Sequence, residues 1–447
     1  MKLARWASVG YLLVFALVCA FLVPPWETPD EPSHLFYVNF VARTGQLPNQ
    51  YVPSLAVAGE GHQPPLYYVI GGLLNRLSQP DATVDVLPVR NPKHVWNRGS
   101  AWNVPVYKHL SHSIFATARD GVGFYLLRLL SVGLTLLNLL YMFKLFDLLL
   151  PKRRWNPLAT LWVVTLPQFA FMSGAVNNDN LANVFSTATV YWVLRILDEP
   201  LERRNYTFAG MTLGLGLLTK KTLLFALPVA LAVLVYVLYR QRRAARAILG
   251  HGLLLFTIAV LLSGFFFVRN YRLYGEFLGI QMEKNTLTEL VQQKPLLSPY
   301  FLRTFPRDMF TSFVGRFGYM NVPLPTVAYL CYALIVAVGA VGLLLRLLRG
   351  RLFDPKVAFG ALFVVACLAG VVVHNLTYSM PQGRFLFPVL PLIAVLLTLG
   401  YQRILDGLRS SAARRALVLI LALGGVMLDV TSIAVLYRFY YLASQYG

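Results

Sequence analysis

Three carboxylates and a histidine lie close together in the segment W-E-T-P-D-E-P-S-H: Glu27, Asp30, Glu31 and His34. The adjacent pair Asp30 and Glu31 stands between two prolines, which present it stiffly. Such a carboxylate can act as a general base, or can bind a divalent cation such as Mg²⁺ or Mn²⁺ with help from Glu27 or His34. Capping of a following helix would explain one acid but not three. The cluster therefore indicates a chemical site, with Asp30 and Glu31 as catalytic candidates and Asp30, Glu31 and Glu27 as candidate metal ligands.

A second polar group, E-G-H-Q-P-P-L-Y-Y, contains Glu60, His62, Gln63 and Tyr67. These side chains could line a polar cleft. The pattern is equally typical of a turn that starts an interfacial helix with an aromatic belt. Together with His34, the residues Glu60, His62 and Tyr67 are candidates for contact with an acceptor or a sugar.

A third polar group is the run V-N-N-D-N, in which Asn177, Asn178 and Asp179 offer many hydrogen-bonding groups suited to sugar hydroxyls. The same residues would cap the helix that follows. Both interpretations stay open on the sequence alone.

Cationic side chains in the predicted outer loops are candidates for binding a phosphate. Lys220 and Lys221 lie in a short hairpin, at a face where positive charge opposes the orientation bias. Arg269 opens a long loop, and Arg384 follows a glycine where a late apolar helix begins. Guanidinium groups can bind two phosphate oxygens at once. Snorkelling to lipid headgroups is the alternative for the two lysines, and a headgroup anchor is the alternative for Arg384.

Apolar helices must position these residues. The chain has 447 residues, of which 57% are hydrophobic and only 13% charged, and its mean hydropathy is +0.58. This composition predicts an all-α polytopic membrane protein and, despite the formal charge of +21, no nucleic-acid partner. About eleven spans are expected, at 9–23, 122–149, 157–175, 181–197, 206–219, 222–239, 248–268, 327–345, 357–374, 385–402 and 416–436.

Basic residues gather in short connections that share one face if the N-terminus is cytoplasmic, which fixes the expected orientation. The first apolar run lacks a small-residue cleavage site and is expected to remain as a span. Two long extracytoplasmic loops follow from this, at 24–121 and 269–326, within a single domain over 1–447. The first loop is expected to hold interfacial helices at 33–44 and 64–77 and an irregular insert at 79–120.

Several segments, taken in order and at these places in the topology, resemble the GT-C superfamily of integral-membrane glycosyltransferases. They are P-D-E-P-S-H, Q-P-P-L-Y-Y, L-L-R-L-L-S-V, V-N-N-D-N-L-A, G-L-L-T-K, V-R-N-Y-R-L-Y-G and Q-G-R-F-L-F-P. Within that superfamily the chain most resembles a broad bacterial membrane family long labelled as a domain of unknown function, related to the aminoarabinose and protein mannosyl transferases.

The resemblance implies a polyprenyl-phosphate sugar as donor and an acceptor on the extracytoplasmic face of the bacterial cytoplasmic membrane. Asp30 best matches the superfamily's catalytic or metal-linked acid, with Glu31 as the alternative. Arg384 matches an arginine before a late helix that contains proline. Q-P-P-L resembles a K-P-P motif in which Gln63 replaces the lysine, so Gln63 joins Arg384, Arg269, Lys220 and Lys221 as a donor-binding candidate.

The expected activity is inverting transfer of a sugar to a hydroxyl of a cell-envelope glycan, a lipid or a surface protein. A transporter or flippase of lipid-linked saccharides, and a non-catalytic envelope-assembly protein, are the alternatives. Transporters often contain repeats and polar groups near the midplane. Here no repeat of fixed period is evident, and the polar clusters crowd one predicted face.

Overall fold

The computed structural model describes residues 2–78, 89–95, 104–107, 122–150, 152–286, 291–348 and 354–442. Within these residues the protein is built almost entirely from helices, and its only sheet is an antiparallel hairpin of β1 (Arg316–Phe317) and β2 (Val322–Pro323). The helices up to the middle of the chain are α1 (Lys2–Leu22), α2 (Glu31–Thr44), η1 (Pro53–Leu55), α3 (Leu66–Ser78), α4 (Val122–Leu149), η3 (Arg153–Trp155), α5 (Asn156–Val164), α6 (Pro167–Ser173), α7 (Asp179–Asp198) and α8 (Arg203–Leu217). The remaining helices are η4 (Lys221–Phe225), α9 (Ala226–Arg240), η5 (Arg242–Ala244), α10 (Ala245–Tyr274), α11 (Ile280–Thr286), η7 (Tyr300–Thr304), α12 (Phe305–Gly315), α13 (Thr326–Leu348), α14 (Pro355–Thr377), η8 (Gly383–Val389), α15 (Leu390–Gly407), α16 (Ser411–Tyr437) and η9 (Arg438–Leu442).

Eight helical segments in the described residues are long and apolar enough to cross a membrane. They are Leu3–Leu22, Val122–Leu149, Lys221–Arg240, Arg242–Tyr274, Thr326–Leu348, Pro355–Thr377, Gly383–Gly407 and Ser411–Leu442. The other three expected spans correspond to the broken pair α5 and α6, to the polar helix α7 and to the short helix α8. The multi-pass helical membrane fold is confirmed, while the count of eleven spans and their orientation stay predictions.

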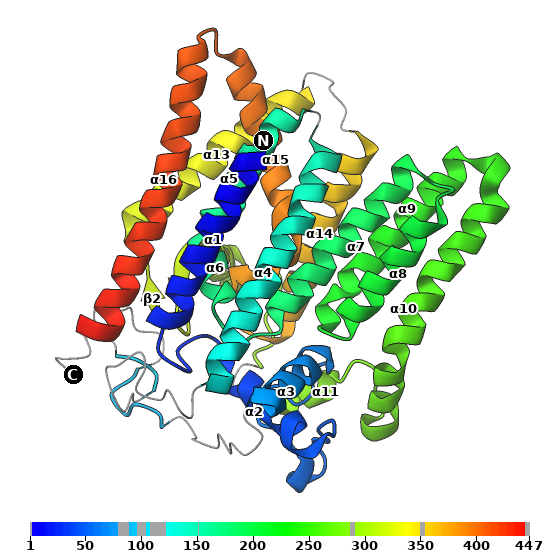
Figure 1. Ribbon diagram of the computed structural model, residues 1–447, viewed down its shortest axis with the longest axis vertical. Helices are drawn as coiled ribbons and strands as arrows, with labels where there is room; N and C mark the ends of the chain where they lie inside the picture. The colour runs from blue at the N-terminus through cyan, green and yellow to red at the C-terminus, as the bar shows by residue number, and fades with distance from the viewer. Residues whose placement is uncertain are drawn as a thin grey trace.

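The helices pack side by side in one bundle (Figure 1). Helix α7 lies between α4 and α8, and α10 covers the other side of α8. On the far side of the bundle α13 packs against α15. Glycines allow the closest approach there, because a Cβ on Gly400 would lie 2.0 Å from the carbonyl oxygen of Gly339. Small residues at helix contacts are typical of membrane bundles.

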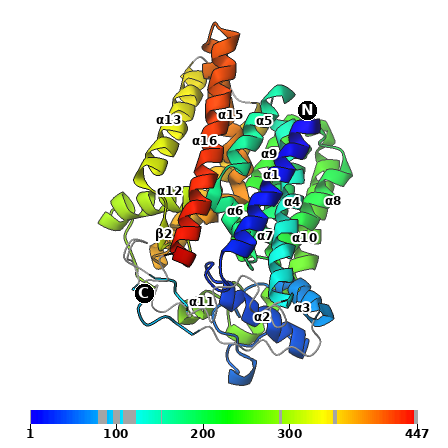
Figure 2. The same ribbon diagram turned by 60° about the vertical axis from the view of Figure 1, so that its left-hand side comes forward.

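Helices α2, α3 and α11 gather at one end of the bundle (Figures 1 and 2). Helices α2 and α3 pack on each other, and α3 also contacts α4. These two helices confirm the expected elements at 33–44 and 64–77. Most of the insert expected at 79–120 lies outside the described residues. Helix α10 continues to Tyr274, six residues beyond the expected end of that span, so Arg269 lies on a helix and not in a loop.

Candidate functional site

Four charged side chains from distant parts of the chain form one continuous series of ion pairs. Arg384, in η8, donates from Nη2 to Oδ2 of Asp30 at 2.5 Å. Its Nη1 lies 3.5 Å from Oδ2 of Asp179, at the start of α7. Lys220, immediately before η4, donates from Nζ to Oδ1 of Asp179. Two acids therefore alternate with two cations, at the same end of the bundle as α2, α3 and α11.

The series is buried but has unused hydrogen-bonding capacity. Arg384 is 4% exposed and Asp179 8%, whereas 34% of the Asp30 side chain is exposed. Nη1 of Arg384 and Oδ2 of Asp179 are close enough for an ion pair, yet neither makes a hydrogen bond within the described structure. A buried polar atom without a partner is costly unless a ligand satisfies it. The geometry therefore suits an oxygen-rich anionic ligand beside Arg384.

Local backbone structure presents Asp30 to this series. Asp30 precedes α2 in a left-handed conformation with φ of 64°. Aspartate tolerates this region better than most residues, although holding it there still costs free energy. Burial of Asp30 would raise its pKa, but the cations Arg384 and Lys220 outweigh burial and lower the pKa of Asp30 below its ordinary 3.8. The Asp30 carboxylate is ionised at neutral pH as a result.

A close backbone contact fixes Arg384 opposite Asp30. A Cβ on Gly383 would lie 2.2 Å from the backbone nitrogen of Phe313 in α12, so only glycine fits here. The Gly383 amide donates to Oγ of Ser312 at 2.8 Å, and Nε of Arg384 donates to Oε1 of Gln382 at 2.6 Å. The Q-G-R order therefore fixes η8 on α12 and aims the guanidinium at the acids.

Glu31 belongs to the scaffold, which corrects its expected roles as a base and a metal ligand. Its side chain is fully buried. Oε1 and Oε2 accept from Nε and Nη2 of Arg128 at 2.9 and 2.7 Å. The backbone amides of Val176 and Trp26 donate to the same two oxygens. With every direction occupied, Glu31 has no free lone pair for substrate or metal.

Arg128 joins this acid to the end of α1. Its Nη1 donates to the carbonyls of Ala20 and Val23, both at 2.6 Å, which have no partner inside the α1 ladder. The Glu31–Arg128 pair therefore fixes the turn that holds both acids, with Glu31 directed at Arg128 and Asp30 directed at Arg384.

Removal of either partner of this buried pair should destabilise the protein strongly. We expect Glu31→Gln or Arg128→Leu to lower the free energy of unfolding by about 3–5 kcal/mol, because the remaining charge loses its partner. Thermal unfolding in detergent, followed by size-exclusion fluorescence, measures this. Arg195→Leu is the matched control, because the Arg195–Glu199 pair is partly exposed, at 29% and 44%. Equal, small effects in all three variants would contradict the assignment.

Glu27 is also removed from the expected metal set. Its carboxylate accepts from the backbone amides of Val106 and Tyr107, and it is fully buried. Glu27 therefore fastens the described piece 104–107 of the first long loop to the end of α1.

The group that the described structure brings within reach of one cation is Asp30, His34 and Glu60, whose ligand atoms lie within 4.8 Å of one another. Two carboxylates and an imidazole suit Mn²⁺ or Zn²⁺ better than Mg²⁺. Two of these donors are already engaged, since Asp30 Oδ2 accepts from Arg384 and Nδ1 of His34 lies 2.9 Å from Oη of Tyr68. Oε2 of Glu60 is buried and has no hydrogen-bond partner within the part of the chain that the structure describes. The two carboxylates fit a divalent cation. Whether His34 can be a third ligand depends on whether one of its ring nitrogens has a free lone pair.

Burial and the neighbouring Asp30 carboxylate raise the pKa of Glu60 from 4.5 to about 7. A raised folded-state pKa means that folded protein holds a proton that unfolded protein loses, so stability falls as the pH rises between these values. Relative to Glu60→Gln, the wild type should lose melting temperature from pH 4.5 to about 7. Melting curves of both proteins over that range measure this, with Glu202→Gln as an exposed control. A difference that does not change with pH would refute it.

Lys221 takes part in a separate cluster. Its Nζ donates to Oε2 of Glu283 in α11 at 2.5 Å and to the carbonyl of Leu278 at 3.3 Å. Lys221 lowers the pKa of Glu283 against the effect of burial. His62 lies nearby, with its own pKa lowered to about 4 by burial and by Lys221. The two adjacent lysines therefore have different partners: Lys220 pairs with Asp179, and Lys221 pairs with Glu283 in α11.

Three further predicted residues make structural contacts. Arg269 donates to the carbonyls of Pro48 and Leu47, at 2.6 and 3.3 Å, and so holds the loop after α2. Tyr67 is fully buried, with its ring edge-on to Tyr68, and so contributes to the packing of α3. Asn177, also fully buried, accepts from the amide of Asp179 at 2.8 Å. This bond holds the start of α7, and contact of Asn177 with a sugar stays a prediction.

Gln63 is 9% exposed, and its Oε1 has no hydrogen-bond partner among the described residues. It lies beside Glu60, whose carboxylate it helps to stabilise. Gln63 therefore stays a ligand-binding candidate.

Sequence reasoning missed Arg128, Glu283 and Tyr68. An arginine within the long apolar run at 122–149 is the one sequence signal that indicates an important buried group. Glu283 and Tyr68 carry no such signal, because their roles depend on how α11 and α3 dock.

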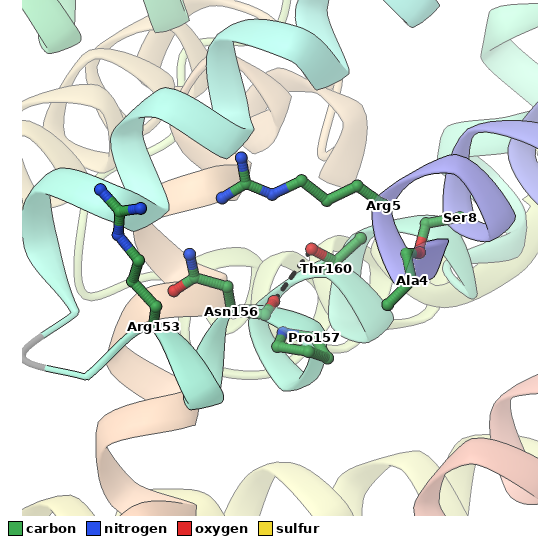
Figure 3. Close-up of a pocket in the computed structure, with 7 residues that line it drawn as sticks. All are labelled: Ala4, Arg5, Ser8, Arg153, Asn156, Pro157 and Thr160. Carbon is green, nitrogen blue, oxygen red and sulfur yellow. Dashed lines mark hydrogen bonds between the residues drawn. The ribbon is translucent and has the colours of Figure 1, made fainter. Parts of the chain in front are cut away.

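Two small pockets lie at the opposite end of the bundle. One, of about 10 Å³, is lined by residues of α1, η3 and α5, including Arg5, Arg153 and Asn156 (Figure 3). This is room for a single water. The other, of about 290 Å³, lies where α7 and α9 end and α14 begins. Neither pocket is lined by any of the four ion-paired residues Asp30, Arg384, Asp179 and Lys220.

A family model described as "Predicted membrane protein (DUF2142)" matches residues 105–393, which is well over half of the chain. The chain belongs to this family. The matched part of this DUF2142 protein includes Asp179, Lys220 and Arg384 but begins after Asp30. No curated protein matches the sequence at a significant level.

The DUF2142 protein is similar to two solved structures of ArnT from Cupriavidus metallidurans. The structure bound to undecaprenyl phosphate has a TM-score of 0.52 and 12% sequence identity, with 98% of this chain and 76% of that chain covered. The apo structure has a TM-score of 0.50 and 13% identity, with 98% and 77% covered. The likeness confirms a GT-C-like fold over nearly the whole chain.

Proposed function

We propose that this protein is an inverting glycosyltransferase that moves a sugar from a polyprenyl-phosphate donor to a hydroxyl acceptor. The observation that carries the proposal is the buried guanidinium of Arg384, held between Asp30 and Asp179, whose Nη1 makes no hydrogen bond to the described residues. A phosphate oxygen satisfies that donor, and an ionised carboxylate stands beside it for the acceptor. The GT-C-like fold supports a lipid-linked donor, since the similar ArnT was solved bound to undecaprenyl phosphate.

The reaction is a single displacement. The acceptor oxygen attacks the anomeric carbon on the face opposite the phosphate, and the bond from that carbon to the phosphate oxygen breaks. The electron pair leaves with the phosphate, whose added negative charge Arg384 and Lys220 stabilise. Asp30 orients the acceptor hydroxyl and takes its proton. The anomeric centre is inverted.

A divalent cation such as Mg²⁺ or Mn²⁺ would be held by Asp30 and Glu60 and would add positive charge beside the leaving phosphate. The donor is a membrane lipid, and the acceptor is a cell-envelope glycan, a lipid or a surface protein. Basic residues at the predicted cytoplasmic connections support an active site on the extracytoplasmic face of the bacterial cytoplasmic membrane.

Purified protein in lipid nanodiscs, supplied with a panel of polyprenyl-phosphate sugars and envelope fractions, tests the function. Mass spectrometry should detect a glycosylated acceptor and free polyprenyl phosphate for at least one donor. A transporter would instead move labelled lipid across a vesicle bilayer without breaking the sugar–phosphate bond. That outcome would replace the proposal.

A further inference from the structure

A buried chain of hydrogen bonds links the backbone carbonyl of Thr219 to the side chain of His34, which lies near Asp30. Nδ2 of Asn178 donates to the carbonyl of Thr219 and to Oη of Tyr68, each at 3.3 Å. Oη of Tyr68 lies 2.9 Å from Nδ1 of His34. Asn178 and Tyr68 are fully buried and His34 is 2% exposed, so water does not compete for these atoms.

The Thr219 carbonyl fixes which way the Asn178 amide faces. With the amide reversed, its oxygen would face the carbonyl oxygen of Thr219, and two acceptors would oppose each other. The amide nitrogen therefore faces Tyr68 as well, and the Tyr68 hydroxyl accepts a hydrogen from it.

A phenol has a single hydrogen to donate. Within the described part of the chain, the hydrogen-bond partners of the Tyr68 hydroxyl are Asn178 and His34. Asn178 presents a hydrogen, so the phenol hydrogen must go to Nδ1 of His34. If Nδ1 also carried a hydrogen, the Tyr68 hydrogen would be buried without an acceptor, which is unfavourable.

We propose that Thr219, Asn178 and Tyr68 lock His34 in the neutral tautomer with its hydrogen on Nε2. His34 then serves as a hydrogen-bond donor to an oxygen of the bound substrate and not as a metal ligand. The lock is independent of the activity, whereas the donor role rests on the proposed glycosyl transfer.

This assignment leaves neither ring nitrogen of His34 free for a cation, because the lone pair of Nδ1 accepts the Tyr68 hydrogen and Nε2 carries a hydrogen of its own. Tyr68 is accordingly a positioning residue, and the two carboxylates alone remain to hold any cation.

Nitrogen-15 spectroscopy of the histidine side chains tests the lock directly. The chain has seven histidines, and the His34 signals are those lost from His34→Gln. In the neutral ring, N–H and bare nitrogen resonate far apart. We expect Nε2 protonated, Nδ1 bare and hydrogen-bonded, and no change in either signal on adding Zn²⁺. Protonation at Nδ1 in the wild type, or a Zn²⁺-dependent His34 shift that Asp30→Asn abolishes, would overturn the proposal.

Tyr68→Phe removes the donor and should release the tautomer, giving a mixture or the Nδ1–H form. Tyr67→Phe removes the neighbouring buried hydroxyl, which makes no hydrogen bond to His34, Tyr68 or Asn178 among the described residues, and should leave the His34 signals unchanged. Equal spectra for the two variants would contradict the lock. In the transfer assay, Tyr68→Phe should raise the KM for donor about tenfold without a matching loss of kcat. Absence of transfer in the wild type would refute the proposed function and leave the spectroscopic result standing.

Discussion

Asp30→Asn is expected to lower turnover by about 10²–10⁴, the usual contribution of a positioned general base. The amide keeps the size of the carboxylate but cannot take the acceptor proton. It also leaves Arg384 without the partner that lies 2.5 Å away. Donor binding should therefore persist or tighten, because the guanidinium becomes free for the phosphate. Single-turnover release of polyprenyl phosphate, together with donor affinity, separates these two effects.

The matched control is Asp198→Asn, which removes an acid paired with Lys356 at the opposite end of the bundle. It should retain wild-type turnover, and the melting temperature of Asp30→Asn should stay near the wild-type value because the Asp30 side chain is partly exposed. Wild-type transfer by Asp30→Asn would show that Asp30 is not the base.

Arg384→Ala should weaken binding of undecaprenyl phosphate about 10- to 100-fold, since hydrogen bonds to charged groups each contribute about 1.5–3 kcal/mol. Arg384→Lys keeps the charge but loses the two-pronged geometry, so its loss should be smaller. Affinity measured in nanodiscs gives both values. Arg154→Gln is the control, because Arg154 pairs with Asp406 at the end of the bundle away from Asp30.

Unchanged affinity in Arg384→Ala would remove this residue from the donor site. Asp30 and Asp179 lose their shared partner in that variant, so reduced folding is a separate expectation. Arg384→Lys resolves the two effects, because it retains a cation between the acids.

The sequence predicted the membrane fold well because hydropathy reports directly on burial in lipid. It could not show where an apolar run breaks into two helices, so the run at 157–175 reads as one span although Thr165 and Leu166 separate α5 from α6. The end of α10 was missed for a related reason. V-R-N-Y-R-L-Y has the polarity of a loop, yet α10 continues through it to Tyr274.

The sequence predicted which residue types form the site and on which face of the membrane they lie. It did not predict which of two neighbouring side chains points into the site. Asp30 and Glu31 are adjacent and chemically alike, and only the position of Arg128 on α4 decides that Glu31 turns inward. Tyr67 and Tyr68 differ in the same way. Docking of α3 brings the Tyr68 hydroxyl to His34 and Asn178, whereas the Tyr67 hydroxyl has no hydrogen-bond partner among the described residues. Such choices depend on contacts between residues far apart in the chain, which local patterns do not contain.

The most direct test of the central claim is the position of the phosphate in a cryo-electron microscopy structure with undecaprenyl phosphate in a nanodisc. The phosphate should lie within hydrogen-bond reach of both Arg384 and Lys220, next to Asp30. A phosphate bound at the opposite end of the bundle would contradict the account. So would a phosphate that lies beyond hydrogen-bond reach of both Arg384 and Lys220.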